Sequence, residues 1–308
     1  MDSGIDEITA VIVTYRREAK LANLLGSLRS SGFSRITQIV IIDDSPVRFS
    51  RLEEFSDLPI DYVQNRERGY ISRAKNLALG MARGDFILFV DDDNIVGREA
   101  LERIYETAAS DGGIGAVAPS VLYFQDPETV WVYATPFRPG KWGFKLVGRN
   151  LRREPSLENR RMDTDALPNA CLVRKKAVLE AGGFDEDLLV NSSADFCSRL
   201  KKKGWKVVAD TGAFFLHDVQ LPLRFGYWME HQIVDPMRVF MEAREWFLIM
   251  KRFHEGLRTF FISSILHYVF VGGPNTLSFI ASGRGRRLAL ISHQARGALR
   301  GYIDSFSR

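Results

Sequence analysis

The stretch GDFILFVDDDNIVG, residues 84–97, holds a run of five apolar residues that ends directly in Asp91, Asp92 and Asp93. An apolar run of this length, closed by turn-forming residues, predicts a strand that is buried on both faces of a sheet. Adjacent carboxylates repel one another, so the triplet is favourable only where a cation or a donor-rich ligand compensates its charge. The stretch therefore predicts a buried strand whose carboxyl end carries a ligand site.

The chain before this strand alternates between strand and helix patterns. Apolar runs at 8–15, 37–45 and 60–65 predict further strands. The segments 17–32 and 69–84 carry apolar residues at helical spacing and end at a glycine, which predicts two helices. Apolar strands that alternate with helices predict an α/β fold, with a Rossmann-like, mostly parallel sheet that has helices on both faces.

Polar residues stand where these predicted strands end. In a parallel sheet covered by helices, ligands bind beyond the carboxyl ends of the strands. We therefore expect a single site that is formed by Thr14–Tyr15, Asp43–Asp44 and Asp91–Asp93.

The second half of the chain is less regular. Between about 120 and 165 it is rich in aromatic residues, Pro and Gly, which predicts loops and short strands beside the site. Beyond about 220 long helical patterns with many Phe and Arg begin, so we divide the chain into a core domain, 1–220, and a helical region, 221–308. The remaining expected elements are helices at 98–110, 175–184 and 193–205 and strands at 206–210 and 213–218.

Composition places the chain among folded proteins of a reducing compartment. It has 308 residues, of which 45% are hydrophobic and 26% charged, enough to form a sizeable core. Cys171 and Cys197 have neither a metal-binding spacing nor the number that a disulfide framework needs. The first residues lack the basic start and apolar core of a signal peptide, so we expect a cytoplasmic protein.

Positive charge is concentrated in the last part of the chain. From residue 244 onward there are ten Lys/Arg and three Asp/Glu, a local net charge of 10 − 3 = +7, against +4 for the whole chain. The stretch from Thr259 has about the length of a membrane span but contains His267 and is broken by GGPN, so a simple transmembrane helix is not expected. An amphipathic helix on an anionic membrane surface fits better. A helical cap on the core or a dimer interface is the alternative.

The aspartate triplet suits a hard divalent cation. Mg²⁺ and Mn²⁺ prefer carboxylate oxygens and keep positions open for substrate phosphates. Two aspartates one residue apart can divide the work, one binding a sugar hydroxyl and the other the metal. Alternatively, Asp93 or Asn94 caps the following helix and the other carboxylates are solvated.

Five segments in order resemble the family 2 glycosyltransferases, which have the GT-A fold. The resemblance extends over about residues 8–217, and it is specific through the order and spacing of the segments rather than through any one of them. It implies transfer of a sugar from a nucleotide diphosphate donor, with inversion at the anomeric carbon and with a divalent metal, Mn²⁺ or Mg²⁺. The segments are AVIVTYRRE, IVIIDDS, RAKNLALGMARGDFILFVDDDN, LPNACLVRKKAVLEAGGFDEDL and FCSRLKKKGW.

The resemblance also implies roles for single residues. On the nucleotide it places Thr14 and Tyr15 beside the base, Asp44 on the base or ribose, Arg73 and Asn76 facing the donor, Asp91 on the ribose and Asp92 beside it. At the metal it places Asp93 and His217. Simpler interpretations stay open: a capped strand end for Thr14 and Tyr15, an Asx-turn for Asp44, and a polar turn residue for His217.

The catalytic base is where the chain departs from the family. Inverting transfer needs a carboxylate that takes the proton of the acceptor hydroxyl. The family usually has an acidic pair before the helix at 193–205, where this chain has Ser192 and Ser193. Asp195, two positions later, is our candidate base. The alternatives are altered chemistry, a structural first-turn role for Asp195 that the helix dipole favours, or one of four other acids: Asp165, Asp185, Glu186 and Asp187.

Trp131, Trp142 and the segments LPNACLV and GGFDEDL are expected on the acceptor side. If the tail binds membrane, the acceptor is a glycan or a polyprenyl- or dolichyl-linked glycan, and the protein is peripheral (monotopic) at the cytoplasmic face of the cell membrane. No base-reading motif accompanies the positive charge, which argues against nucleic acid. The competing functions are a sugar-nucleotide-binding protein of this fold without transferase activity and a basic scaffold that binds membranes or partner helices.

Overall fold

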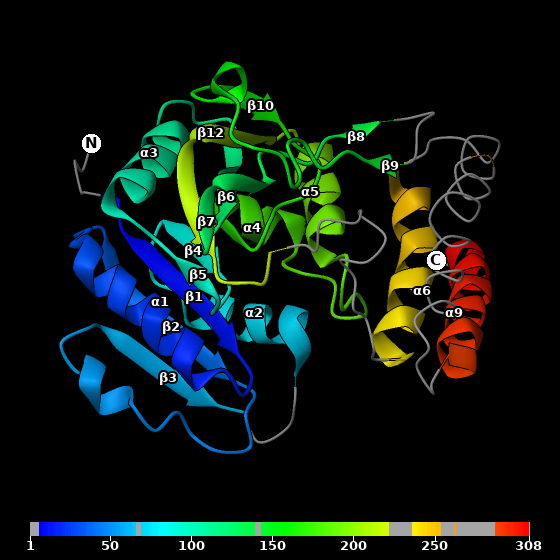
Figure 1. The fold of residues 1–308 in the computed structure, drawn as a ribbon, viewed down its shortest axis with the longest axis horizontal. Helices are drawn as coiled ribbons and strands as arrows, with labels where there is room; N and C mark the ends of the chain where they lie inside the picture. The colour runs from blue at the N-terminus through cyan, green and yellow to red at the C-terminus, as the bar shows by residue number, and fades with distance from the viewer. Residues whose placement is uncertain are drawn as a thin grey trace.

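The computed structural model describes residues 6–65, 69–138, 143–221, 236–253, 262 and 287–307. One large mixed sheet forms the centre, with helices on both of its faces (Figure 1). Its strand order is β10-β12-β6-β11-β4-β1-β2-β3, and β5 and β7 pair with β12 and β6. The expected α/β fold with helices on both faces is confirmed.

The first half of the sheet is parallel, as the alternating pattern predicts. Strands β2 and β4 flank β1, and β3 lies beside β2, all in the same direction. The elements are β1 (Ile8–Thr14), α1 (Glu18–Ser31), β2 (Ile36–Asp43), the 3₁₀ helix η1 (Leu52–Phe55), β3 (Ile60–Gln64), α2 (Tyr70–Met81), β4 (Phe86–Val90), β5 (Asn94–Ile95) and α3 (Arg98–Ala109).

Alternation along the strands separates the two hydrophobic cores. Ile12 of β1 belongs to one cluster with Leu21 and Leu25 of α1, on the face that α3 also covers. The next residue toward the N-terminus, Val11, belongs to the other cluster, which includes Ala74 of α2 and residues of α4 and α5. Successive side chains of a strand point to opposite faces, so the apolar runs are explained by burial on both sides.

The second half of the sheet mixes directions. Strand β11 is antiparallel to both of its neighbours, β4 and β6, whereas β12 is parallel to β6. The predicted strands at 206–210 and 213–218 are one strand, β12, with a register shift between Asp210 and Phe214. The elements are β6 (Ile114–Tyr123), β7 (Asp126–Val132), β8 (Phe137–Arg138), β9 (Gly143–Phe144), η2 (Pro155–Leu157), β10 (Arg161–Asp163), β11 (Ala170–Arg174), α4 (Lys175–Ala181), α5 (Ser192–Lys202) and β12 (Lys206–His217).

Two long helices of the C-terminal region, α6 (Pro236–Phe253) and α9 (Arg287–Ser307), pack side by side (Figure 1). Glycine makes this close approach possible: a Cβ added to Gly297 would lie 2.2 Å from the backbone oxygen of Phe240, and one on Gly301 would lie 2.2 Å from that of Arg244.

Helix α6 also packs on the core domain. A third cluster joins Leu188 and Ala194 to Leu248, Ile249 and Met250 of α6. The helices within the described ranges are too short or too polar to cross a bilayer. Trp142, residues 222–235 after the predicted boundary, and most of the predicted amphipathic tail, including the stretch from Thr259, lie outside the described residues.

Candidate active site

The predicted strand ends meet at one edge of the sheet. The hydroxyl of Thr14, the last residue of β1, donates to Asp92 Oδ2 at 2.7 Å, just beyond β4. The backbone N–H of Asp44 donates to Thr14 O at 3.0 Å, which brings in the end of β2. Three chain segments that are far apart in sequence therefore converge, as the site prediction requires.

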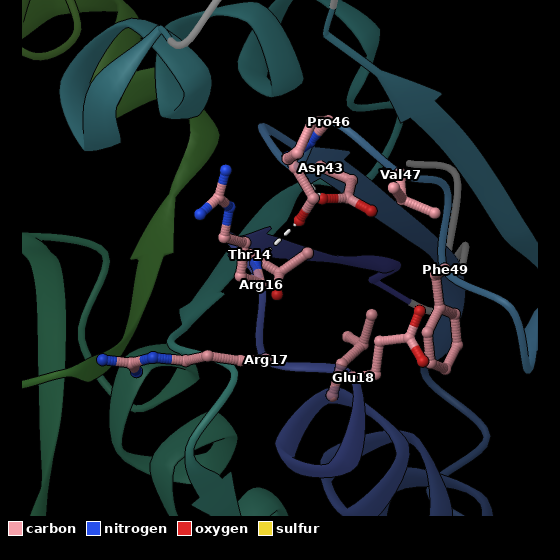
Figure 2. Close-up of a pocket in the computed structure, with 10 residues that line it drawn as sticks. Thr14, Arg16, Arg17, Glu18, Asp43, Pro46, Val47 and Phe49 are labelled. Atoms are coloured by element: carbon pink, nitrogen blue, oxygen red, sulfur yellow. Dashed lines mark hydrogen bonds between the residues drawn. The ribbon is translucent and has the colours of Figure 1, made fainter.

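A pocket of about 420 Å³ opens beside this edge, between the β1–α1 and β2–η1 loops (Figure 2). Its size suits a small ligand such as a nucleoside. Thr14 lines it, and Asp43, rather than Asp44, is the aspartate in its lining. The lining is completed by Arg16, Arg17, Glu18, Leu21, Ser45, Pro46, Val47 and Phe49.

The three aspartates have different surroundings. Asp91 is the most exposed, with its side chain 31% accessible and its Oδ1 3.9 Å from Lys75 Nζ. Asp92 and Asp93 are buried. Burial raises the pKa of Asp91, against the opposing charge of Lys75. Burial also raises the pKa of Asp92 to about 6, although the Thr14 hydroxyl and Arg17 favour its charged form.

Arg17, which the sequence interpretation did not single out, bridges the two buried carboxylates. Its Nη1 lies 3.0 Å from Asp92 Oδ1 and 2.8 Å from Asp93 Oδ2. In the sequence, Arg17 looks like a solvated residue at the start of a helix, because it stands immediately before α1. Its two carboxylate partners lie 75 and 76 residues further along the chain. No local sequence signal connects them.

His217 ends β12 next to Asp93, as its predicted role requires. Its Nε2 lies 3.3 Å from Asp93 Oδ1, and its ring stands edge-on to that of Trp131 at a centroid distance of 5.0 Å. Burial alone would raise the pKa of Asp93, but His217 and Arg17 together hold it below its usual value.

Asp93 and His217 together have the chemistry to bind a divalent cation. His217 Nδ1 is buried without a hydrogen-bond partner, and Asp93 Oδ1 is buried with His217 Nε2 as its neighbour at 3.3 Å. Within the described ranges, no cluster of three or more His, Cys, Asp or Glu side chains forms a complete metal site. A Mg²⁺-type ion that is bound by one or two protein ligands and by substrate phosphates does not need such a cluster. The residues therefore fit a metal that the protein and a donor hold jointly.

Asp44 and Asn76, both predicted to contact the donor, are occupied in positioning the chain. The Asp44 carboxylate accepts from Asn65 Nδ2 at 2.6 Å and from the Gly69 N–H at 3.0 Å. Asn76 exchanges hydrogen bonds with the backbone of Phe184 at 2.8 and 2.9 Å. These contacts fix the loops around the edge, and their roles toward a donor stay predictions.

The second glycine of the GGFDED segment is explained by this contact. Gly183 has a φ of +71°, and a Cβ there would lie 2.7 Å from Asn76 Oδ1. Glycine is therefore required for both conformation and space. Of the other predicted donor contacts, Arg73 is exposed on α2, and Tyr15 is half-buried with Arg16 over its ring at 5.1 Å.

Asp195, the candidate base, is fully buried between two arginines. Arg199 makes a bidentate contact with its Oδ2 at 2.8 and 2.9 Å, and Arg252 of α6 pairs with its Oδ1. Arg252 also lies 2.8 Å from Asp185 Oδ2. In this arrangement both oxygens of Asp195 are engaged and no acceptor hydroxyl can reach them, so the base role requires another conformation.

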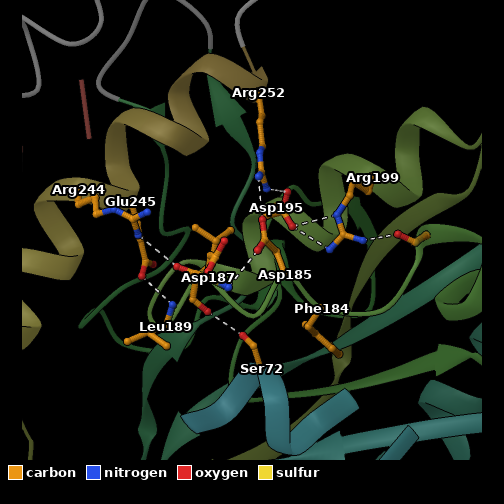
Figure 3. A network of polar contacts seen from close by, with 12 residues as sticks. Ser72, Phe184, Asp185, Asp187, Leu189, Asp195, Arg199, Arg244, Glu245 and Arg252 are labelled. Atoms are coloured by element: carbon orange, nitrogen blue, oxygen red, sulfur yellow. Dashed lines mark hydrogen bonds and ion pairs between the residues drawn. The ribbon is translucent and has the colours of Figure 1, made fainter. Parts of the chain in front are cut away.

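The loop before α5, which we call the 185–191 loop, is held from two sides (Figure 3). From α2, the Ser72 hydroxyl donates to Leu188 O at 2.7 Å. From α6, the carboxylate of Glu245 accepts from three successive backbone N–H groups, those of Leu189, Val190 and Asn191, at 2.6, 2.9 and 2.8 Å. Helix α6 is therefore part of the structure around the candidate base.

The other acids named as base candidates differ in the accessibility of their carboxylates. Asp165 accepts from Lys201 Nζ at 2.6 Å and from the Phe137 N–H at 2.7 Å. Glu186 is exposed and accepts a hydrogen bond from Asn76 Nδ2 at 2.9 Å. Asp187 is also exposed, and its backbone oxygen accepts from Arg244. The exposed acids of the 185–191 loop are therefore more accessible than Asp195.

With this geometry in view, comparison with known proteins defines the class. Residues 9–178 match the family model described as Glycosyl transferase family 2, which is more than half of the chain. The chain belongs to this family. The resemblance inferred from the sequence is confirmed.

Two curated relatives illustrate the distance within the family. The chain is 24% identical over 221 residues to the pre-mycofactocin glycosyltransferase of Mycobacterium tuberculosis (strain H37Rv). The aligned residues cover 71% of this chain and 44% of that protein. It is 30% identical over 132 residues to the succinoglycan biosynthesis protein ExoM of Rhizobium meliloti, covering 41% of this chain and 42% of that protein. The chain thus spans less than half the length of these curated relatives.

Solved structures confirm the GT-A fold. The mannosyltransferase PcManGT of Pyrobaculum calidifontis, in complex with GDP-Man and Mn²⁺, superposes with a TM-score of 0.58 at 14% identity, over 99% of this chain and 88% of that one. Residues 1–349 of TarS from S. aureus, in complex with UDP-GlcNAc, give 0.57 at 16% identity, over 96% and 89%. At these identities the likeness establishes the fold alone.

Proposed function

We propose that this protein transfers a sugar from a UDP- or GDP-linked donor to a hydroxyl group, with inversion at the anomeric carbon. The observation that carries the proposal is the position of Asp93 and His217 at the strand edge, beside the pocket that Thr14 and Asp43 line. The pocket receives the nucleoside, and the diphosphate lies over the aspartates. Relatives of this family and fold bind UDP- and GDP-sugars, which supports both donor classes.

A divalent metal, Mn²⁺ or Mg²⁺, is held by Asp93 and His217 together with the donor diphosphate. When bound, it stabilises the negative charge of the departing nucleoside diphosphate as a Lewis acid. Asp91, the more exposed member of the triplet, accepts hydrogen bonds from the ribose, with Asp92 next to it. Tyr15 lies beside the base and Arg73 faces the donor, while Asp44 and Asn76 position the surrounding loops.

An acid near the 185–191 loop takes the proton of the acceptor hydroxyl. At the same time the hydroxyl oxygen attacks the anomeric carbon, and the bond between that carbon and the diphosphate breaks. Asp195 performs this step only if Arg252 moves away, because both carboxylate oxygens are engaged in the structure described above. Glu186, which is exposed on the same loop, is the alternative base.

The acceptor is proposed to be a glycan, free or linked to a polyprenyl or dolichyl lipid, at the cytoplasmic face of a membrane. The support is the composition of the C-terminal region, which carries a net charge of +7 from residue 244 onward. On α9, Leu299 is 62% exposed between the exposed Arg296 and Arg300. An apolar side chain among arginines suits the interface of an anionic bilayer.

The test is a calorimetric titration of UDP and GDP, each with and without Mn²⁺, on wild type and Asp93→Asn. We expect one nucleotide to bind in a Mn²⁺-dependent way, and Asp93→Asn to weaken this binding at least about tenfold, because a charged metal ligand is lost. Asp111→Asn is the matched control, since Asp111 precedes β6 at the opposite end of the sheet and pairs with Lys206. Absence of binding by folded wild type would refute the proposal.

A second candidate is a sugar-nucleotide-binding protein that does not transfer. The engagement of Asp195 by two arginines favours it, because it removes the candidate base from reach. Under this hypothesis we expect Mn²⁺-dependent nucleotide binding, without hydrolysis of the donor and without transfer of its sugar. Release of nucleoside diphosphate from the donor, lost in Asp93→Asn, would exclude it.

A further inference from the structure

Arg17 stands where a bound cation would neutralise the aspartates. One nitrogen, Nη1, lies 2.8 Å from Asp93 Oδ2 and 3.0 Å from Asp92 Oδ1, so a single positive group serves both carboxylates. The two carboxylates are nearly enclosed, with side chains 8% and 4% exposed. Buried carboxylates at this spacing repel one another and need such a partner.

The arginine itself is much less enclosed than its partners. Its side chain is 51% exposed, and Figure 2 shows it extended away from Glu18 and Phe49. A long side chain that is half in solvent can leave its position with little loss of packing. The aspartates cannot move as easily, because Thr14 holds Asp92 through its hydroxyl and His217 lies against Asp93.

The other cations near the triplet are committed to different carboxyl and carbonyl groups. Lys75 lies nearest to Asp91, at 3.9 Å. Lys20 donates to the backbone oxygen of Asp218 and lies 3.7 Å from its carboxylate. Among the described residues, Arg17 is the basic side chain that pairs directly with both buried carboxylates.

We infer that Arg17 is a built-in counter-ion of the metal site, which competes with a divalent cation for the negative charge of Asp93. The inference rests on the proposed function, since it takes Asp93 as a metal ligand. The guanidinium lies on Oδ2 of the carboxylate whose Oδ1 faces His217, so Arg17 and a metal ion between Asp93 and His217 would compete for the charge of one carboxylate and repel each other. Without metal, Arg17 offsets part of the negative charge of Asp92 and Asp93, and it thereby lowers the affinity for metal alone.

The test measures Mn²⁺ binding without nucleotide, from the electron paramagnetic resonance signal of free Mn²⁺. We expect Arg17→Gln to bind Mn²⁺ about tenfold more tightly than wild type, the equivalent of about 1.4 kcal/mol. Arg83→Gln is the matched control: it removes the same charge from a side chain that is 68% exposed and pairs with Asp61 at the start of β3, at the opposite end of the sheet. Its affinity is expected to stay within about twofold of wild type, since an exposed charge acts weakly at a distance.

Thermal unfolding provides a second readout that a merely structural arginine would not produce. In EDTA, Arg17→Gln is expected to unfold at a lower temperature than wild type, because two buried carboxylates lose their partner. Saturating Mn²⁺ should restore the melting temperature of Arg17→Gln and raise that of wild type less. A melting temperature of Arg17→Gln that stays low in Mn²⁺ would overturn the inference.

Other outcomes separate this inference from the proposed function. Mn²⁺ affinity of Arg17→Gln equal to or weaker than that of Arg83→Gln overturns the inference, while Mn²⁺-dependent binding of UDP or GDP by the same samples leaves the proposed function standing. Absence of Mn²⁺ binding by every variant also overturns it. In that case, binding of UDP or GDP by wild type would leave sugar transfer without a metal as the remaining possibility, and absence of nucleotide binding would refute the proposed function as well.

Discussion

Single residues in this protein show one recurring arrangement, in which a buried carboxylate is neutralised by a partner from a distant part of the chain. Asp210 of β12 is bound by Arg103 of α3 at 2.8 Å, and Asp304 of α9 by Arg244 of α6 at 2.7 Å. Glu245 differs, because its partners are backbone N–H groups rather than a side-chain cation. Breaking such contacts on one side leaves a buried charge or donor unsatisfied.

Glu245→Gln tests this at one residue. An amide offers a single acceptor oxygen and places its own N–H₂ group against backbone donors, so we expect a loss of about 1–3 kcal/mol in the free energy of unfolding. Urea denaturation measures this. Glu102→Gln, which removes an exposed pair with Arg98, is the control and should change stability by no more than about 0.5 kcal/mol.

The pH dependence of the Glu245 contact has a definite sign. Burial raises the pKa of Glu245 above 4.5, against the opposing hydrogen bonds from the loop. A carboxyl pKa that is raised by folding contributes stability that is full below the unfolded value and is lost as pH rises through the folded value. The advantage of wild type over Glu245→Gln should therefore shrink as pH rises from 4.5. An advantage that grows with pH would contradict this assignment.

At the scale of strands and helices, the sequence pattern predicts the elements of the first part of the chain better than strand β6. The segments from 8 to 110 follow local apolar periodicity, and their main strands and helices were predictable because β1, β2 and β4 are buried on both faces. Strand β6 is fully buried along its length, yet Gly115 and Pro119 interrupt its pattern, and it was not predicted. Strands pair across long separations, so burial in the sheet overrides local propensity there.

The contacts of the candidate site likewise include some that the sequence indicates and others that it does not. Thr14, Asp93 and His217 lie at strand ends, which pattern alone locates, and the structure brings all three to one edge. For Asp195, the contact from Arg199 follows from its position four residues along the same helix. The contact from Arg252 crosses 57 residues, and nothing local to either residue indicates it.

The packing of α6 against α9 gives an element-scale prediction. Gly297→Ala introduces a methyl group 2.2 Å from the backbone oxygen of Phe240, so the helices must separate, and we expect a loss of about 1–3 kcal/mol. Gly26→Ala in α1 makes the opposite case, because no atom lies within 4 Å of the added group. There the better helix propensity of alanine should stabilise the protein by up to about 1 kcal/mol. Calorimetric unfolding of both variants checks the two signs.

In the whole molecule, packing connects the regions on either side of residue 220, the boundary that the sequence pattern suggests and that stays a prediction. Leu188 and Ala194 belong to the cluster that Leu248, Ile249 and Met250 complete. Helix α6 also supplies the hydrogen-bond acceptor for the 185–191 loop. The two regions therefore share a core, although their sequences differ in character.

A chain that ends at residue 221 tests this sharing. Removing α6 exposes Leu188, which is 0% exposed in the full chain, and leaves the N–H groups of residues 189–191 without Glu245. We expect the shortened protein to unfold at a lower temperature and to show faster amide hydrogen exchange in the 185–191 loop and α5. Exchange in β1 and β2, whose hydrophobic clusters include no residue of α6 within the described ranges, serves as the internal control. Unchanged exchange in α5 would show that the regions are independent.

Glu245 and Arg252 are seven residues apart, close to two turns of α6, so both point to the same side of the helix. A single residue inserted between them would turn Arg252 by about 100° relative to Glu245, and the helix could then reach the 185–191 loop or Asp195 but not both. Length in this segment is therefore constrained even where the identity of individual residues is not. Homologous chains that keep both contacts should vary here by substitution and not by insertion or deletion.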